Sequence, residues 1–190
     1  MCEDSKEGSV SSRLFLNSIK GLNKIFGFVK GGGKDIREMI STKIESIYKI
    51  VHTTTNTKAK VQLYLFLFQY YSHLYGSISD RFYRSLYDFI NNSEILHCSL
   101  AEVFFDLLLI SLQQDSNTNR VLAFIKRILQ LCFTAQPNFI ATTLIMLSKL
   151  FQEKEALKVM IQQKEDFMRE NTEATIGYDP TKREPIFAGA

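Results

Sequence analysis

The sequence has few cysteines and no long apolar run. These two features argue against a disulfide-stabilised secreted protein and against a membrane-spanning protein. Its cysteines are Cys2, Cys98 and Cys132, an odd number without framework spacing, which is typical of a reducing compartment. The longest apolar segment, AEVFFDLLLISL at 101–112, contains acidic residues and is shorter than the roughly 18 apolar residues that cross a membrane. The opening MCEDSKEGSVSSR lacks the apolar core of a secretory signal. We therefore expect a protein of the cytosol or nucleus that makes no membrane contact.

Histidine is also scarce, and the three histidines form no metal-binding pattern. His52, His73 and His97 have no histidine partner at i, i+4, and the adjacent Cys98 has no second cysteine or histidine nearby in the sequence. Carboxylates such as Asp106 and Asp115 are scattered among the predicted helices without an evident partner. The sequence therefore predicts no metal site, no catalytic residues and no enzymatic activity.

A phosphate-binding loop is suggested by GGGKD at 31–35 but fails at the positions that carry its chemistry. The motif needs a glycine where Phe28 stands and a serine or threonine where Asp35 stands, and no strand precedes it. Three successive glycines are better read as a flexible turn that ends a helix. We expect no cofactor and no small-molecule substrate.

Apolar residues recur with helical spacing along most of the chain. One inward face of a helix is predicted by apolar residues at alternating steps of four and three, namely Phe15, Ile19, Leu22, Phe26 and Val29. Similar patterns predict helices over about 11–30, 35–52, from 57, from 80, from 99, over 117–133, from 137, and over 153–169. The fold class is therefore all-α.

Taken in pairs, the predicted helices begin about 40 residues apart, which is the period of HEAT and armadillo repeats. This period favours an α-solenoid of antiparallel helix pairs, with an irregular helical bundle as the alternative. The domain organisation that we expect is a flexible polar leader over 1–10, a helical-repeat domain over 11–170 and an extended strap over 171–190.

The segment SDRFYRSLYDFI at 79–90 places tyrosine and arginine beside an apolar stripe. Arg81, Tyr83, Arg84 and Tyr87 belong to the residue types that interfaces favour. The segment is either an ordinary amphipathic helix with a polar flank or a helix edge that docks another chain or RNA.

A second group of basic residues lies in NRVLAFIKRILQLC at 119–132. Arg120 and Arg127 are seven residues apart and so share a helix face, with Lys126 beside them. A solvated basic face is the ordinary explanation, and contact with RNA phosphates is the functional one. The chain as a whole is only mildly basic, with 23 lysines and arginines against 20 acidic residues, so we expect RNA binding to be weak and salt-sensitive.

The final segment YDPTKREPIFAGA, residues 178–190, fits neither a helix nor a regular strand. Proline fixes its own φ and favours extended backbone in the residue before it. Two of the chain's three prolines stand here, so the segment is predicted to be an extended strap with apolar residues on either side of a charged centre. The residues expected to form it are Tyr178, Asp179, Pro180, Lys182, Arg183, Pro185 and Phe187.

Five segments in order resemble the CCAAT-binding-factor family of nucleolar proteins, which assemble the large ribosomal subunit. They are LNSIKGLNKIFGFVK, IESIYKIVHTTTNTKAKVQLYLFLFQ, SDRFYRSLYDFI, NRVLAFIKRILQLC and YDPTKREPIFAGA, and they cover most of the chain from about Ser11 onward. The last three are distinctive. GGGKD departs from the proline-containing link expected after the first helix. Family chains continue beyond the strap, so we expect further helix to follow it in a longer protein.

The resemblance implies a non-catalytic α-solenoid that acts in ribosome biogenesis on early precursors of the large (60S) subunit. It implies a nuclear, mostly nucleolar location. The implied partners are a second nucleolar-complex protein, other pre-60S assembly factors and pre-ribosomal RNA. The alternative function is a DNA-binding transcription regulator of the CCAAT-binding type, although no zinc-finger spacing and no basic zipper is present.

Overall fold

A computed structural model describes residues 4–26, 38, 40–91, 95–96, 98–158, 176–177 and 186–187. These residues are helical except for short connections and two strands of two residues each, which confirms the predicted all-α class. The helices are α1 (Asp4–Phe26), α3 (Ile44–Thr53), α4 (Thr57–Leu74), α5 (Asp80–Asn91), α6 (Ala101–Gln114), α7 (Thr118–Cys132), α8 (Pro137–Glu153) and the 3₁₀ turn η2 (Glu155–Lys158).

The chain divides into two compact units. The first comprises Met1–Ser79 and Cys98–Phe104, and the second comprises Asp80–His97 and Phe105–Ala190. The boundary therefore passes through α6. The stacking of helix pairs into a solenoid stays a prediction.

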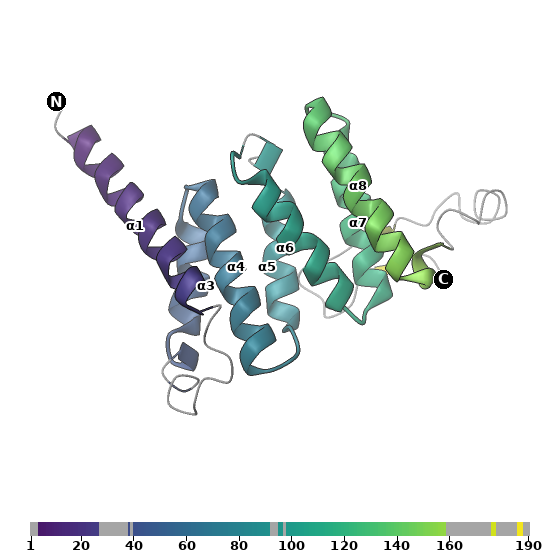
Figure 1. Ribbon diagram of the computed structural model, residues 1–190, viewed down its shortest axis with the longest axis horizontal. Helices are drawn as coiled ribbons and strands as arrows, with labels where there is room; N and C mark the ends of the chain where they lie inside the picture. The colour runs from purple at the N-terminus through teal and green to yellow at the C-terminus, as the bar shows by residue number, and fades with distance from the viewer. Residues whose placement is uncertain are drawn as a thin grey trace. The chain divides into compact units, whose positions relative to one another are not determined.

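In the first unit, α1 and α3 both pack against α4, and Figure 1 shows α1 running beside α4. Phe26, Phe66, Tyr70 and Leu74 form the buried cluster that joins them. The rings of Phe26 and Phe66 lie 5.2 Å apart in a tilted arrangement, which aromatic pairs favour.

A buried polar contact fixes α1 on α4. The side-chain amide of Asn23 donates to both the backbone oxygen and the side-chain oxygen of Gln62, each at 2.9 Å. Ile19 and Phe26, four residues before and three residues after Asn23, are buried as well. These three residues at i, i+4 and i+7 make the inner face of α1.

The predicted inner face of α1 is only half right. Ile19 and Phe26 are buried, but Phe15 and Leu22 are 37% and 46% exposed. The four residues lie within about 60° of the helix circumference, but the side of α1 that faces α4 is centred nearer Asn23, so Phe15 and Leu22 fall at its edge and stay partly exposed. Val29 lies outside the described residues.

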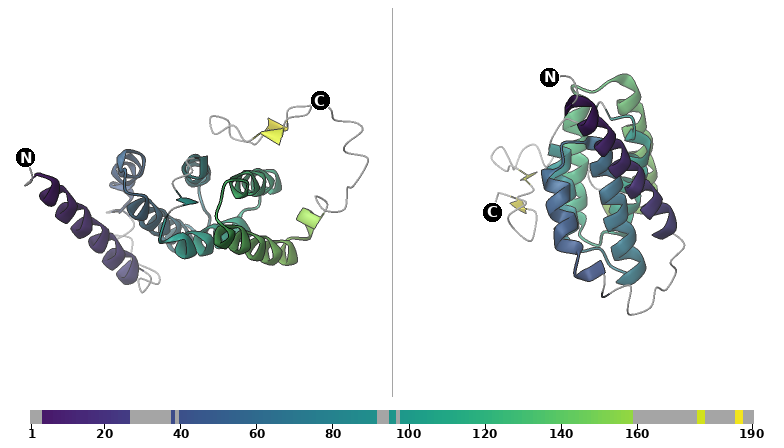
Figure 2. Two further views of the ribbon diagram at one scale, coloured as in Figure 1. Left: turned by 90° about the horizontal axis from the view of Figure 1, so that it is seen from above. Right: turned by 90° about the vertical axis from the view of Figure 1, so that its left-hand side faces the viewer.

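In the second unit, α5 and α7 pack on each other, and α7 packs on α8. The predicted apolar stripes are confirmed, since Phe82, Leu86 and Ile90 of α5 are fully buried together with Phe124 of α7. Figure 2 gives two further views of these helices.

Two helix starts agree with the signals in the sequence. Asn117 caps α7, because its side-chain oxygen accepts from the backbone N–H of Arg120 at 3.1 Å. Pro137 occupies the first turn of α8, where its missing N–H removes no helical hydrogen bond.

Two predicted helix boundaries are wrong. Helix α1 begins at Asp4, within the residues predicted to form a flexible leader, since polar residues can continue a helix without an apolar stripe. The helix predicted over 153–169 is interrupted at Lys154, whose backbone is extended with φ −111° and ψ 93°. Only a 3₁₀ turn follows, and residues 159–169 lie outside the described residues.

The two short strands were not predicted. Strand β1 (Ile176–Gly177) pairs antiparallel with β2 (Ile186–Phe187), with Ile176 opposite Phe187 and Gly177 opposite Ile186. This pairing brings together the two ends of the segment that includes most of the predicted strap. The extended strap over 171–190 stays a prediction.

Candidate partner and RNA contact residues

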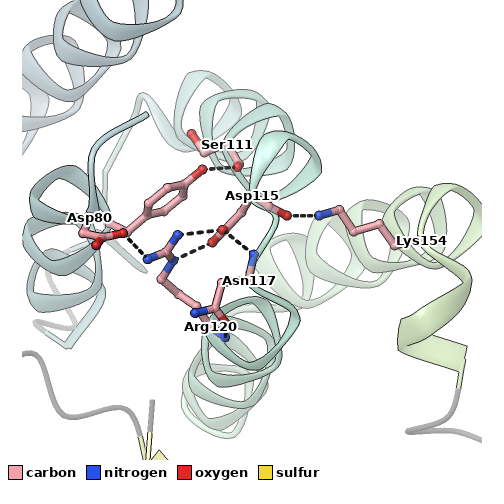
Figure 3. A network of polar contacts seen from close by, with 7 residues as sticks. Asp80, Ser111, Asp115, Asn117, Arg120 and Lys154 are labelled. Carbon is pink, nitrogen blue, oxygen red and sulfur yellow. Dashed lines mark hydrogen bonds and ion pairs between the residues drawn. The ribbon is translucent and has the colours of Figure 1, made fainter. Parts of the chain in front are cut away.

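The structure buries Arg120, which the sequence predicted to be a surface contact. Its side chain is only 7% exposed. The guanidinium donates to both carboxylate oxygens of Asp115, from Nε at 2.6 Å and from Nη2 at 2.7 Å, and from Nη1 to Asp80 at 2.7 Å (Figure 3). This two-pronged geometry is the arrangement that makes an arginine–carboxylate pair strong.

Burial lowers the pKa of Arg120, but hydrogen bonds and charge from Asp115 and Asp80 outweigh that effect and raise the pKa overall. The guanidinium therefore stays charged inside the unit. Its charge is already neutralised by two carboxylates, so Arg120 has an internal role in this structure, and its contact with RNA or a partner stays a prediction. Arg120 and Arg127 are seven residues apart and so lie on the same side of α7. Neighbouring elements bury Arg120, whereas Arg127 is only half-buried.

Tyr83 is likewise buried, at 1% exposure. Its hydroxyl donates to the backbone oxygen of Ser111 at 2.9 Å, and the Arg120 guanidinium lies over its ring, 4.2 Å from the centroid. Burial, followed by the charge of Asp115, raises the pKa of Tyr83 above its ordinary value. Tyr83 thus joins α5 to α6 and α7 in this structure, and its place on a docking edge stays a prediction.

Asp115 is the centre of this network, although the sequence suggested no partner for it. Besides Arg120, its carboxylate accepts from the backbone N–H of Asn117 at 2.9 Å. Its backbone oxygen accepts a hydrogen bond from the Lys154 ammonium, just after α8 (Figure 3). Burial lowers the pKa of Lys154, and the charge of Asp115 opposes this shift. One short connection between α6 and α7 therefore binds α7 and the residue after α8, and Arg120 extends the network to Asp80 of α5.

Tyr87 and Arg127 join α5 to α7 nearer the surface. The rings of Tyr87 and Phe124 meet edge-on, with centroids 5.2 Å apart. Arg127 donates from Nη2 to the backbone oxygen of Asn91, the last residue of α5, at 3.1 Å. A cation at this end of a helix satisfies an otherwise unbonded carbonyl and interacts favourably with the helix dipole. Burial raises the pKa of Tyr87, and the charge of Arg127 partly opposes the shift.

The remaining predicted contact residues lie at the surface of two helices. Arg81 is exposed on α5, Arg84 is half-buried on the same helix, and Lys126 is half-buried on α7. With Tyr87 and Arg127, which are also half-buried, they are the members of the predicted set that keep exposed surface.

Most of the strap lies outside the described residues. Only Phe187 has a described backbone position, in β2, and nothing is described of its side chain. The predicted strap residues outside the described part are Tyr178, Asp179, Pro180, Lys182, Arg183 and Pro185.

Neither a metal-binding cluster nor a membrane-spanning helix is present within the described residues. No group of three or more histidine, cysteine or acidic side chains is arranged to hold a metal ion there. Among the described helices, none combines the length and apolar composition that a membrane span requires.

The sequence did contain a signal for the Arg120 network. Asp115 stands five residues before Arg120, with the capping residue Asn117 between them, so the two side chains flank the start of one helix. A carboxylate just before a helix can pair with an arginine in the first turn of that helix. Asp80, the other carboxylate, is 40 residues away and could only be found once α5 and α7 were packed together.

The sequence profile of the CBF/Mak21 family matches residues 43–190. Individual relatives are similar over most of the chain. The CCAAT/enhancer-binding protein zeta of Mus musculus is 29% identical over 166 residues, 87% of this chain and 15% of the mouse protein. The ribosome biogenesis protein NOC1 of Chaetomium thermophilum is 23% identical over 160 residues, 84% of this chain and 15% of that protein.

A third relative, the nucleolar complex protein 1 of Drosophila melanogaster, is 26% identical over 155 residues, 80% of this chain and 13% of that protein. The chain thus spans about a seventh of the length of these curated relatives. No solved structure matches it significantly.

Proposed function

Because the chain belongs to the CBF/Mak21 family, we propose that it is a non-catalytic assembly factor in ribosome biogenesis. The observation that carries this proposal is the family match over residues 43–190, together with two relatives whose names refer to ribosome biogenesis and to a nucleolar complex. In finer detail, the protein is a helical scaffold on early precursors of the large (60S) subunit, in the nucleolus.

The position of the basic residues supports a scaffold over a reader of DNA sequence. A helix that reads a DNA groove needs several basic or polar side chains exposed along one face. On α7, Arg120 is buried in ion pairs, which leaves Lys126 and Arg127 in the second half of the helix. Further accessible arginines lie on α5 instead. A distribution over two helices favours dispersed contacts with an RNA–protein particle.

The proposed partners are a second nucleolar-complex protein, pre-60S assembly factors and pre-ribosomal RNA. The buried polar residues Tyr83, Asp115 and Arg120 of the second unit hold helices together, so binding is expected through apolar and basic surfaces. No small-molecule substrate and no cofactor is part of this proposal.

The test is to tag the protein in its own cells, purify it and sequence the RNA that co-purifies. The proposal expects enrichment of precursors of the large-subunit RNA, together with large-subunit assembly factors in the protein fraction. A tagged, unrelated nuclear protein of similar charge is the control for RNA that co-purifies nonspecifically.

The same cells also test the transcription alternative. Crosslinking and sequencing of bound DNA should give no reproducible sequence motif if the protein is an assembly factor. A defined DNA motif, with no enrichment of ribosomal RNA precursors, would replace the proposed function with that of a transcription regulator.

A further inference from the structure

Two arginines of the second unit, Arg84 on α5 and Arg127 on α7, each have a donor that the described residues do not use. Both side chains are half-buried. In each of them the Nε atom is shut off from solvent and has no hydrogen-bond partner among the described residues. A buried donor without an acceptor is costly, and the cost is larger when the donor belongs to a charged group. Both side chains are therefore suited to an anion that the protein itself does not supply.

Arg84 is the clearer case, because it has no partner within the described part of the chain. It forms neither a hydrogen bond nor an ion pair there. Asp88 stands four residues later on α5, at the spacing of a helical ion pair, but no ion pair joins these two described residues. A guanidinium that is half removed from water and matched to no carboxylate favours an anion from outside the protein.

Helices α5 and α7 run side by side in the same direction. The start of α7 meets the start of α5, where Arg120 pairs with Asp80 at 2.7 Å. The later part of α7 meets the end of α5, where Arg127 donates to the backbone oxygen of Asn91 at 3.1 Å. The guanidinium of Arg127 is thereby held at the end of α5.

Arg84 lies on the side of α5 that Arg127 reaches. Arg84 and Asn91 are seven residues apart, so they lie within about 20° of each other round the helix and about 10 Å apart along it. Tyr87 stands between them and within about 60° of both. Burial raises the pKa of Tyr87 and the charge of Arg127 partly opposes this shift, so the two side chains are close. We call the line of Arg84, Tyr87 and Arg127 the α5–α7 seam.

The charge of the two helices also favours an anion at the seam. Together α5 and α7 carry five basic residues and two acidic ones, and α7 has no acidic residue. Of the two acidic residues, Asp80 is already paired with Arg120. The other, Asp88, lies about 40° round α5 from Arg84 and opposes an anion there. The net charge of the two helices is therefore positive, with one nearby carboxylate of opposite effect.

We propose that Arg84 and Arg127 each bind a phosphate of the same single-stranded RNA segment, which lies along the α5–α7 seam with Tyr87 between the two contacts. Arginine suits phosphate because two parallel N–H donors of its planar guanidinium match two phosphate oxygens. Basic side chains combined with an aromatic one are typical of single-stranded nucleic-acid binding. This inference rests on the proposed function, in which the protein acts on precursors of the large subunit, and it names the two side chains that hold the RNA backbone.

The experiment measures binding of the full 190-residue chain to a fluorescent oligouridylate of about ten nucleotides. Fluorescence anisotropy over a salt series gives the slope of log affinity against log salt. Arg84→Gln and Arg127→Gln should each reduce this slope by about 0.7, and the double variant by about 1.4. Lys149→Gln, at an exposed position of α8 in the same unit, removes the same charge and should leave the slope unchanged.

Two further variants test the chemistry of the contact at Arg84. Asp88→Asn removes the opposing carboxylate and should strengthen binding at low salt by at least about twofold. Arg84→Lys keeps the charge and should keep the slope, but it should weaken binding, because an ammonium cannot form the two parallel bonds of a guanidinium. Arg84 has no bond to lose within the described residues, so its variants should melt at the wild-type temperature. If Arg127→Gln lowers that temperature, the variants at Arg84 and Asp88 decide.

Three outcomes would overturn the proposal. An unchanged slope in the Arg84 variant would show that this side chain meets no phosphate. An equal fall in the Lys149 control would show that only net charge matters. A glutamate peptide that displaces the RNA as well as unlabelled RNA of equal charge does would assign the seam to an acidic protein partner.

The proposed function has a separate readout. Recovery of ribosomal RNA precursors with the tagged wild-type protein depends on the assembly role and not on these two arginines alone. Intact recovery, together with an unchanged slope in the variants, overturns only the phosphate contacts. Loss of recovery with the wild-type protein overturns the assembly role.

Discussion

Arg120 illustrates how a buried charge is accommodated. Removing a guanidinium from water is costly unless its donors are bonded and its charge is matched. Here three of its nitrogens donate to Asp115 and Asp80, and its flat face covers the ring of Tyr83. Arginine suits this position because its planar fork can serve two carboxylates and an aromatic ring at once.

Replacing Arg120 with alanine should strongly destabilise the second unit, because Asp115 would remain buried without its counter-ion. The loss expected for removing one partner of a buried pair is about 3–5 kcal/mol. Urea unfolding followed by helical circular dichroism measures it. Arg81→Ala, on the exposed side of α5, is the matched control and should cost less than about 1 kcal/mol. Similar losses for both variants would mean that the ion pairs are not a main source of stability.

The raised pKa of Tyr83 predicts sensitivity to alkaline pH. In the unfolded chain the phenol ionises near pH 10, whereas burial keeps it neutral in the folded unit. Its contribution to stability is therefore complete below about pH 10 and falls as the pH rises further.

Tyr83→Phe should cost about 0.5–1.5 kcal/mol at neutral pH, since the bond to Ser111 is lost. It should also make the fall of the melting temperature between about pH 9.5 and 11 less steep. An unchanged slope would show that other tyrosines dominate alkaline unfolding. The exposed Tyr75→Phe is the control.

The role of Tyr83 and Arg120 could not be predicted from local spacing. Both residues are of types common at interfaces, and both lie beside an apolar stripe in the sequence. Their burial depends on Asp80 and Ser111, which are brought near only when α5, α6 and α7 pack. Lys126 and Arg127 lie on the same helix as Arg120, but they are only half-buried.

At the scale of elements, helix positions were predictable where a chemical signal marked them. Asn117 and Pro137 marked the starts of α7 and α8, and the apolar spacing in α5 and α7 identified the buried sides. The interruption at Lys154 was not marked, because EKEALK at 153–158 has good helix formers throughout. There the packing of Leu157, which is fully buried, and the bond from Lys154 to Asp115 override local preference.

Capping residues give a test at this scale. Asn117→Ala and Asn56→Ala should each lower stability by about 1 kcal/mol, because both side chains accept hydrogen bonds from free N–H groups at a helix start. Gln136 precedes α8 but makes no such bond, so Gln136→Ala should change stability by less than about 0.5 kcal/mol. Chemical denaturation distinguishes the three variants, and an equal loss at Gln136 would contradict the capping assignment.

At the scale of the whole molecule, RNA contact is expected to be weak and electrostatic. If Lys126 and Arg127 touch phosphates, replacing both with glutamine should reduce the slope of log affinity against log salt by about 1.4 for single-stranded RNA. Filter binding over a salt series measures this slope. Lys43→Gln with Lys49→Gln, on the first unit, removes the same charge and should leave the slope unchanged if the contact is local. Equal reductions would indicate that only net charge matters.

The family of the protein was predictable from the resemblance and not from site chemistry. Apolar periodicity identified a helical chain. The spacing of the histidines and the GGGKD segment fitted neither a metal site nor a phosphate-binding loop, so local motifs indicated no function. Five sequence segments pointed to one family, and the match over residues 43–190 confirms that family. The exposure of Phe15 and Leu22 was not predicted, because both were expected on the same buried face of α1 as Ile19.

The proposed role in large-subunit assembly is tested most directly by depleting the protein from its own cells and measuring ribosomal subunits on sucrose gradients. The account predicts a fall in free large subunits relative to small subunits, with accumulation of unprocessed large-subunit RNA before translation declines. An unchanged subunit ratio, accompanied by altered transcription of a defined set of genes, would contradict the account.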